Sequence, residues 1–176
     1  MRRAAVLPFI ILAAVVVGGL LYLYGGPAFH QTYTESGGTA GPTLPGEQSH
    51  FTVLAQGADA SGMDARVNYR IQSADQLVEL WQMLYTDSGQ PVPNVDFNTY
   101  EVLALFDGSH TTGGYGIELT SIVDSGGQRV VTITHIEPGD SCVPPGGVTS
   151  PFMIIQVPKS SLPITRIEKT QTNQCE

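Results

Sequence analysis

Val102-Leu-Ala-Leu-Phe106 is an uninterrupted apolar run bounded by turn residues. A strand with one solvated face alternates apolar and polar residues, whereas a strand covered on both faces is apolar throughout. The run therefore predicts a central strand of a sheet that is covered on both sides, with Leu103 and Leu105 in the core.

An amphipathic helix is expected before this strand, at about Ala74 to Tyr85. Ser73 and Gln76 have the spacing of a capping box, which marks a helix start. The apolar residues that follow recur at the spacing of one helix face, at Leu77, Leu80, Trp81 and Leu84. On this stripe we interpret Trp81 as a core anchor and not as a platform for a ligand.

Six further segments show the period-2 pattern or the apolar composition of strands: 51–55, 67–71, 117–123, 128–136, 152–157 and 164–169. Asp124-Ser125-Gly126-Gly127 joins two of them as a hairpin turn. The chain contains no alternation of strands and helices that would build a parallel sheet. We therefore expect an α+β, mostly β fold: a single small domain of about seven short, largely antiparallel strands and one amphipathic helix.

Charge and composition restrict the function. The 176 residues carry 8 basic and 16 acidic side chains, a net charge of -8. Nucleic-acid binding depends on clustered Lys and Arg, so it is not expected. A hydrophobic content of 41% with 14% charged residues predicts a packed core.

The N-terminus predicts a membrane anchor in residues 1–24. Ala4 to Tyr24 is free of charge and long enough to cross a bilayer as a helix. Arg2 and Arg3 precede it, so the N-terminus is expected in the cytoplasm and the rest outside it, as a single-pass protein of the cell membrane. A cleavable signal peptide is the alternative, although only Gly25, Gly26 and Ala28 offer a weak cleavage site.

Residues 25–49 are expected to form a flexible tether, because Gly, Pro, Ser and Thr make up 15 of the 25. Residues 50–176 would then form the extracytoplasmic domain. Its two cysteines, Cys142 and Cys175, predict one disulfide in an exported protein. Neither cysteine lies where a lipoprotein is lipidated.

Catalytic signatures are missing from the sequence, so we predict no enzyme activity and no cofactor. A hydrolase would need Ser109 or Ser141 to meet a histidine and a carboxylate, and the spacing does not require this. The candidate histidines are His110 and His135, of which His135 is expected in the core, and the candidate carboxylates are Asp107 and Asp140. The oxygens of Asp107, Ser109 and Thr111 would form only a weak calcium site, and we predict no metal.

The order of short motifs along residues 50–170 resembles the C-terminal domain of PrcB-like proteins, the protease-complex stability subunit family. These motifs are Phe51-Thr-Val-Leu-Ala-Gln-Gly57, Ser61-Gly62, Leu80-Trp81, Val95-Asp96-Phe97, Val102-Leu-Ala-Leu-Phe106 with Gly108, Thr112-Gly-Gly-Tyr115 with Ile117, Pro138-Gly139 before Cys142, Ser150-Pro151 and Val157-Pro-Lys159. The resemblance implies a non-catalytic exported subunit that helps a subtilisin-like protease to assemble or stay stable.

We therefore expect a membrane-tethered domain that binds another protein, such as an exported protease. A glycine pair beside an exposed tyrosine is a candidate partner surface, at Gly113, Gly114 and Tyr115, with the His110 loop and the Pro144–Gly147 loop beside it. A structural bend is the alternative for the glycines. For the function the alternatives are a stand-alone envelope scaffold and a hydrolase that uses Ser109 and His110.

Overall fold

A computed structural model describes residues 32–34, 47–60, 62–85 and 89–174. Its elements are β1 (Thr32–Thr34), β2 (Glu47–Gln48), β3 (Thr52–Gly57), β4 (Val67–Ile71), α2 (Ala74–Leu84), β5 (Tyr100–Phe106), β6 (His110–Thr112), β7 (Gly116–Ser125), β8 (Gln128–Pro138), β9 (Gly146–Thr149), β10 (Phe152–Pro158) and β11 (Ile164–Asn173). Over the described ranges, the predicted mostly β fold with one short helix is confirmed.

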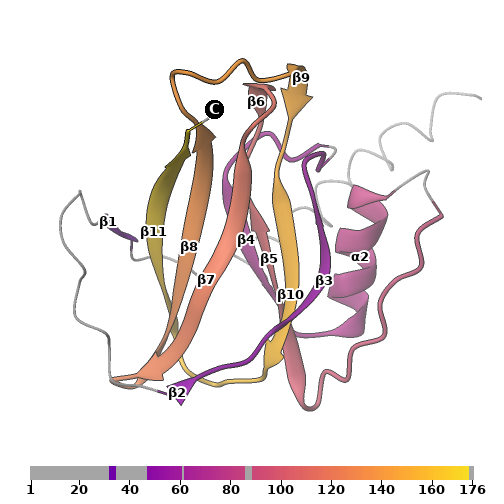
Figure 1. Ribbon diagram of the computed structural model, residues 1–176. Coiled ribbons are helices and arrows are strands. Elements are labelled where there is room, and N and C mark those ends of the chain that lie inside the picture. The colour runs from indigo at the N-terminus through magenta and orange to yellow at the C-terminus, as the bar shows by residue number, and fades with distance from the viewer. Residues whose placement is uncertain (1–31, 35–46, 61, 86–88, 175–176) are drawn as a thin grey trace, which may run out of the picture.

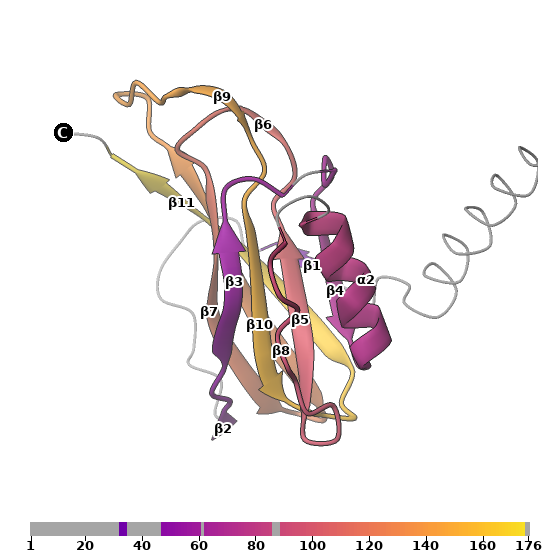
Figure 2. The same cartoon turned by 90° about the vertical axis from the view of Figure 1, so that its right-hand side faces the viewer.

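The elements form three layers (Figure 1). A five-stranded sheet has the order β1-β11-β8-β7-β2, and a four-stranded sheet has the order β3-β10-β5-β4. Helix α2 covers the face of the four-stranded sheet that points away from the five-stranded sheet. Strands β6 and β9 pair at one end, above both sheets in Figures 1 and 2.

The middle layer explains the apolar run in β5, because both of its faces are buried. Successive side chains of a strand point to opposite faces. Val102 and Phe106 therefore pack with α2, whereas Leu103 and Leu105 pack against the five-stranded sheet. The neighbouring β10 divides its apolar residues between the same two cores.

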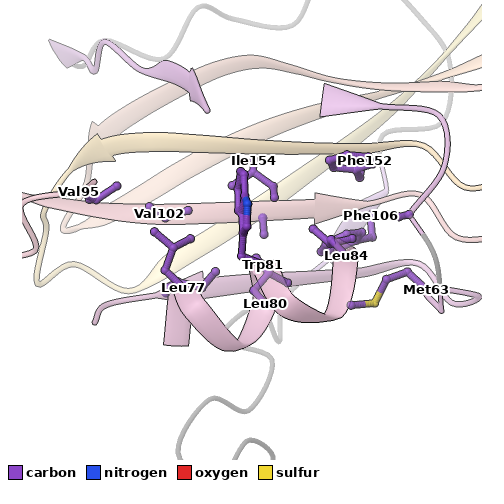
Figure 3. Packing of buried hydrophobic residues seen from close by; sticks show 13 residues of the cluster. Met63, Leu77, Leu80, Trp81, Leu84, Val95, Val102, Phe106, Phe152 and Ile154 are labelled. Carbon is purple, nitrogen blue, oxygen red and sulfur yellow. The ribbon is translucent and has the colours of Figure 1, made fainter. Parts of the chain in front are cut away.

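The helix begins and packs as its sequence pattern predicts. The backbone N–H of Gln76 donates to Oγ of the N-cap residue Ser73 at 3.3 Å. The four residues of the apolar stripe, Leu77, Leu80, Trp81 and Leu84, are all buried. Figure 3 shows them facing the aromatic and aliphatic side chains of β5 and β10. Trp81 thus lies in the core, at 6% exposure.

Two ionic clusters lie between the sheets, at opposite ends of β5. At the end near α2's first turn, Glu101 is fully buried and binds two arginines. Its Oε1 accepts from Nη1 of Arg129 on β8 at 3.1 Å, and its Oε2 accepts from Nε of Arg70 on β4 at 2.8 Å. Arg129 also forms a two-bond pair with Asp124, at 2.7 and 2.8 Å. The other cluster is centred on Asp107.

The strand inventory needs correction. Nine strands, and not about seven, lie between residues 52 and 173 in the part of the chain that the structure describes. The sequence analysis missed β6 and β9, which are short and rich in Thr and Gly. Strand pairing is largely antiparallel as expected, but β11 runs parallel to β8, because the chain passes through β9 and β10 before it returns to the same sheet.

Residues 25–49 were expected to be a tether, yet two of their segments join the five-stranded sheet. β1 pairs with β11 and β2 pairs with β7. Backbone hydrogen bonds to a sheet edge need no apolar side chains, so composition did not reveal this pairing. In the described residues, no helix is long and apolar enough to cross a membrane. The expected anchor at residues 4–24 lies outside them.

The variant Glu101→Gln is expected to lower the free energy of unfolding by about 3 kcal/mol, because it removes the buried counter-charge of Arg70 and one of the two counter-charges of Arg129. Urea denaturation followed by the fluorescence of Trp81, the single tryptophan, measures this. The control Glu118→Gln changes an exposed carboxylate and should shift stability by less than about 0.5 kcal/mol. Equal losses in both variants would contradict the importance of the buried cluster.

Candidate protein-binding surface

The surface is organised around a buried carboxylate, Asp107, which directly follows β5. Its side chain is 1% exposed and contacts three basic groups. Oδ1 lies 2.5 Å from Nδ1 of His135 and 2.8 Å from Nη2 of Arg66, and Oδ2 lies 2.7 Å from Nε2 of His110. Burial raises the pKa of Asp107, but the hydrogen bonds from His135 and His110 outweigh it, so the net pKa is below the usual range.

His135 is buried on β8, as the sequence analysis expected of a core histidine. Burial lowers its pKa, while the hydrogen bond to Asp107 and the nearby Glu168 carboxylate raise it; the net pKa lies above the ordinary value. Glu168 on β11 lies 3.7 Å from Nε2 of His135 and 3.1 Å from Nε of Arg166. The proximity of the His135 imidazole is the main reason that the pKa of Glu168 is lowered.

Asp107 also positions the half-exposed aromatic ring of Tyr115 through His110. The imidazole of His110 stacks on the Tyr115 ring with the centroids 3.8 Å apart and the planes 7° from parallel. The hydrogen bond between Asp107 and Nε2 of His110 restrains the imidazole, and the imidazole in turn restrains the Tyr115 ring stacked on it. The structure thus brings together two of the predicted surface residues, Tyr115 and His110.

The glycines beside Tyr115 are packed against a loop of the same chain. A Cβ added to Gly113 would lie 2.8 Å from Cγ of Pro145, and the N–H of Gly113 donates to the Pro145 carbonyl at 2.9 Å. Gly114 has φ +90°, which favours glycine, and it faces Pro138 and Pro144. The close backbone approach at these glycines is therefore internal, and Tyr115 is the residue of the trio that is left for contact with a partner.

A groove of about 450 Å³ runs beside Tyr115, between β7 of one sheet and β3 and β10 of the other. Its lining combines apolar side chains with exposed backbone. The lining residues are Phe51, Gln56, Gly57, Ala58, Tyr115, Gly116, Ile117, Glu118, Leu119, Ile136, Pro151, Phe152 and Met153. Only Tyr115 among the residues predicted for the surface lies in it. The sequence analysis missed the groove because it depends on which strand edges remain unpaired.

The hypothetical hydrolytic site finds no support in the geometry. Within the described ranges, no hydrogen bond joins Ser109 to His110 or His135, and the N–H of Ser109 donates to the Asp64 carbonyl at 3.0 Å. Both oxygens of Asp107 face basic groups, so the loop does not present them to calcium. The described part of the chain holds no cluster of three or more side chains suited to a metal.

The predicted disulfide involves Cys175, which lies outside the described residues. Sγ of Cys142 lies 3.4 Å from the carbonyl oxygen of Asn173, so β11 ends beside the turn that carries Cys142. Gly139 donates its N–H to the same carbonyl at 2.8 Å. The pairing of Cys142 with Cys175 stays a prediction.

The pKa directions predict how stability depends on pH. His135 has a raised pKa, so its contribution is complete below about pH 6.5 and is lost as the pH rises through its folded-state pKa. Asp107 and Glu168 have lowered pKa values, so their contribution is complete above about pH 4.5 and is lost on acidification. Urea denaturation should therefore show maximal stability between these limits.

The variant His135→Gln tests the predicted fall of stability at high pH. It should be less stable than the wild type at pH 6, and its stability should fall less above about pH 6.5, because the titrating imidazole is gone. His50→Gln, at an exposed histidine, is the matched control. A decline that persists unchanged in His135→Gln would show that another group causes it.

Comparisons with known proteins agree with the resemblance noted from the motifs. A family model described as PrcB C-terminal matches residues 102–158. No curated protein and no solved structure matches the chain. The matched residues run from β5 through β10 and include Asp107, His110, Tyr115 and His135. This segment of the chain, residues 102–158, is thus similar to the PrcB C-terminal family.

Proposed function

We propose that the chain is a non-enzymatic, membrane-tethered protein-binding domain outside the cytoplasm that stabilises or assembles an exported protease or another envelope complex. The observation that carries this proposal is the PrcB C-terminal match, because it covers Tyr115 and the sides of the adjoining groove that β7 and β10 form. The arrangement of Asp107, His110 and Tyr115 supports a binding role, since it holds an aromatic ring rigidly at the surface.

The mechanism is mass action. A domain that binds only the folded state of its target stabilises that state by RT ln(1 + [L]/Kd). Attachment of both proteins to one membrane raises their effective concentration, so a modest affinity suffices. The partner is expected to be an exported subtilisin-like protease, in line with what the resemblance implies.

Two alternatives remain distinct from this proposal. A stand-alone envelope scaffold would bind a membrane protein or a glycan, but the single tryptophan is in the core and offers no platform for a sugar. A hydrolase would need Ser109 and His110 to cooperate, and His110 instead bonds Asp107 and stacks on Tyr115. The binding role therefore has the stronger support.

The test compares cells that have or lack the chain. Deletion should shorten the lifetime of an exported protease several-fold in pulse-chase, and the full-length chain should restore it. The variant Tyr115→Ala should restore it poorly while keeping the melting temperature, because the ring is half-exposed. Met83→Ala, at a side chain 42% exposed on α2, is the control that should restore it fully.

Unchanged lifetimes of all exported proteases after deletion would reject the protease role. A loss of melting temperature in Tyr115→Ala that equals its loss of function would assign Tyr115 to the core and not to a partner contact.

A further inference from the structure

Beside the groove, strand β7 has an edge that the described strands cover only at its far end, through β2. β2 pairs with it only at Glu47 and Gln48, opposite Asp124 and Val123, and the N–H of Ser49 donates to the Ile122 carbonyl at 2.9 Å. The chain then crosses to β3 in the other sheet. Among the described residues, the segment 116–121 of β7 consequently pairs on one side only, with β8.

The groove opens along the same edge. Ile117 and Leu119 pack into the core between the sheets and also line the groove. On its other side lie β3, which is an edge strand of its sheet, and the first residues of β10. An edge strand exposes backbone N–H and C=O groups that can pair with another chain. The site therefore combines main-chain hydrogen-bonding groups with apolar side chains, as in binding by strand addition.

We propose that an extended segment of the partner protein adds to β7 at Gly116–Leu119, where it continues the line of β2 and places side chains in the groove. This inference rests on the proposed protein-binding function and identifies the surface that would perform it. Tyr115, held by His110, would contact the end of the added strand.

Charge defines the chemistry of the added segment. Glu118 is exposed on β7 and is the charged residue of the groove lining. Oppositely charged side chains across neighbouring strands are favourable and like charges are not. The partner segment should therefore carry Lys or Arg opposite Glu118, between apolar residues. Pairing with a second copy of this chain is less favourable, because it would bring together two molecules that each carry a net charge of -8.

A β-bulge limits the length of the pairing. The register of β7 against β8 shifts between Leu119 and Ser121. Bulges bend a strand and protect an edge from further pairing. Since β2 already occupies β7 at Val123 and Asp124, the regular part of the free edge is Gly116–Leu119. A short segment with one basic residue fits this edge.

The test uses the full-length chain in mild detergent and a defined probe. The probe is a capped peptide of alternating valine and threonine with one central lysine. When the peptide binds, hydrogen exchange should slow at those amides of residues 116–119 that point to the free edge, because they gain partners, whereas the alternate amides already point to β8. The same peptide with proline at alternate positions lacks the N–H groups for pairing and should give no protection.

A charge exchange tests the specificity of this contact. Glu118→Lys should weaken binding of the lysine peptide by about three- to tenfold, and replacing the peptide's lysine by glutamate should restore it. Glu79→Lys, an equal charge change at an exposed site on α2, should leave binding unchanged. Melting temperatures of both variants should match the wild type, which separates lost binding from lost folding.

Three results would overturn the inference: no protection of residues 116–119, equal binding of the lysine and glutamate peptides, or protection caused by dimerisation of the chain. If the Glu118→Lys variant maintains the protease lifetime in cells as well as the wild type does, strand addition at β7 is rejected while the proposed function still stands. Failure of the proposed function has a different signature, namely that deletion of the whole chain leaves every exported protease unaffected.

Discussion

The architecture depends on two ionic contacts that join β5 and β8 across the space between the sheets. Glu101 meets Arg129 at one end, and Asp107 meets His135 at the other. Glu101 and Asp107 are as far apart along the sequence as Arg129 and His135 are. The core residues between these ends are Leu103, Leu105, Val131 and Ile133. A buried charge without its partner is strongly unfavourable. The contacts therefore fix which residues of the two sheets face each other.

The Asp107 end of this arrangement is also where the candidate surface lies. Asp107 binds His135 inside the sandwich and His110 outside it, so one carboxylate connects the core to the stacked ring of Tyr115. The packing of Gly113 against Pro145 also restrains the segment that leads into Tyr115. Rigid placement of an aromatic side chain reduces the entropy lost on binding, which favours a contact role for Tyr115.

Local sequence patterns predicted the elements that depend on their own residues. The apolar run 102–106 identified the doubly covered strand, and the stripe from Leu77 to Leu84 identified the helix. The ionic contacts were not predicted, although Glu101 and Asp107 share the side-chain parity of Leu103 and Leu105 on β5. The alternation of side chains along a strand shows which face an acidic residue points to, but not whether it is buried. Burial of the acid depends on a basic partner in the other sheet, which the local pattern does not show.

The two open sides of the sandwich differ, and this difference favours the β7 edge as the place for a partner. On the side of β4 and β11, Arg66, Arg70, Arg166 and Glu168 fill the space between the sheets with paired charges. A partner would have to break these pairs to enter there, at the cost of exposing or isolating charges. On the side of β7 and β3, the same space is a groove lined by apolar side chains and backbone groups, beside strand edges that no described strand covers. An added strand there would gain hydrogen bonds and bury apolar surface without breaking any described ion pair.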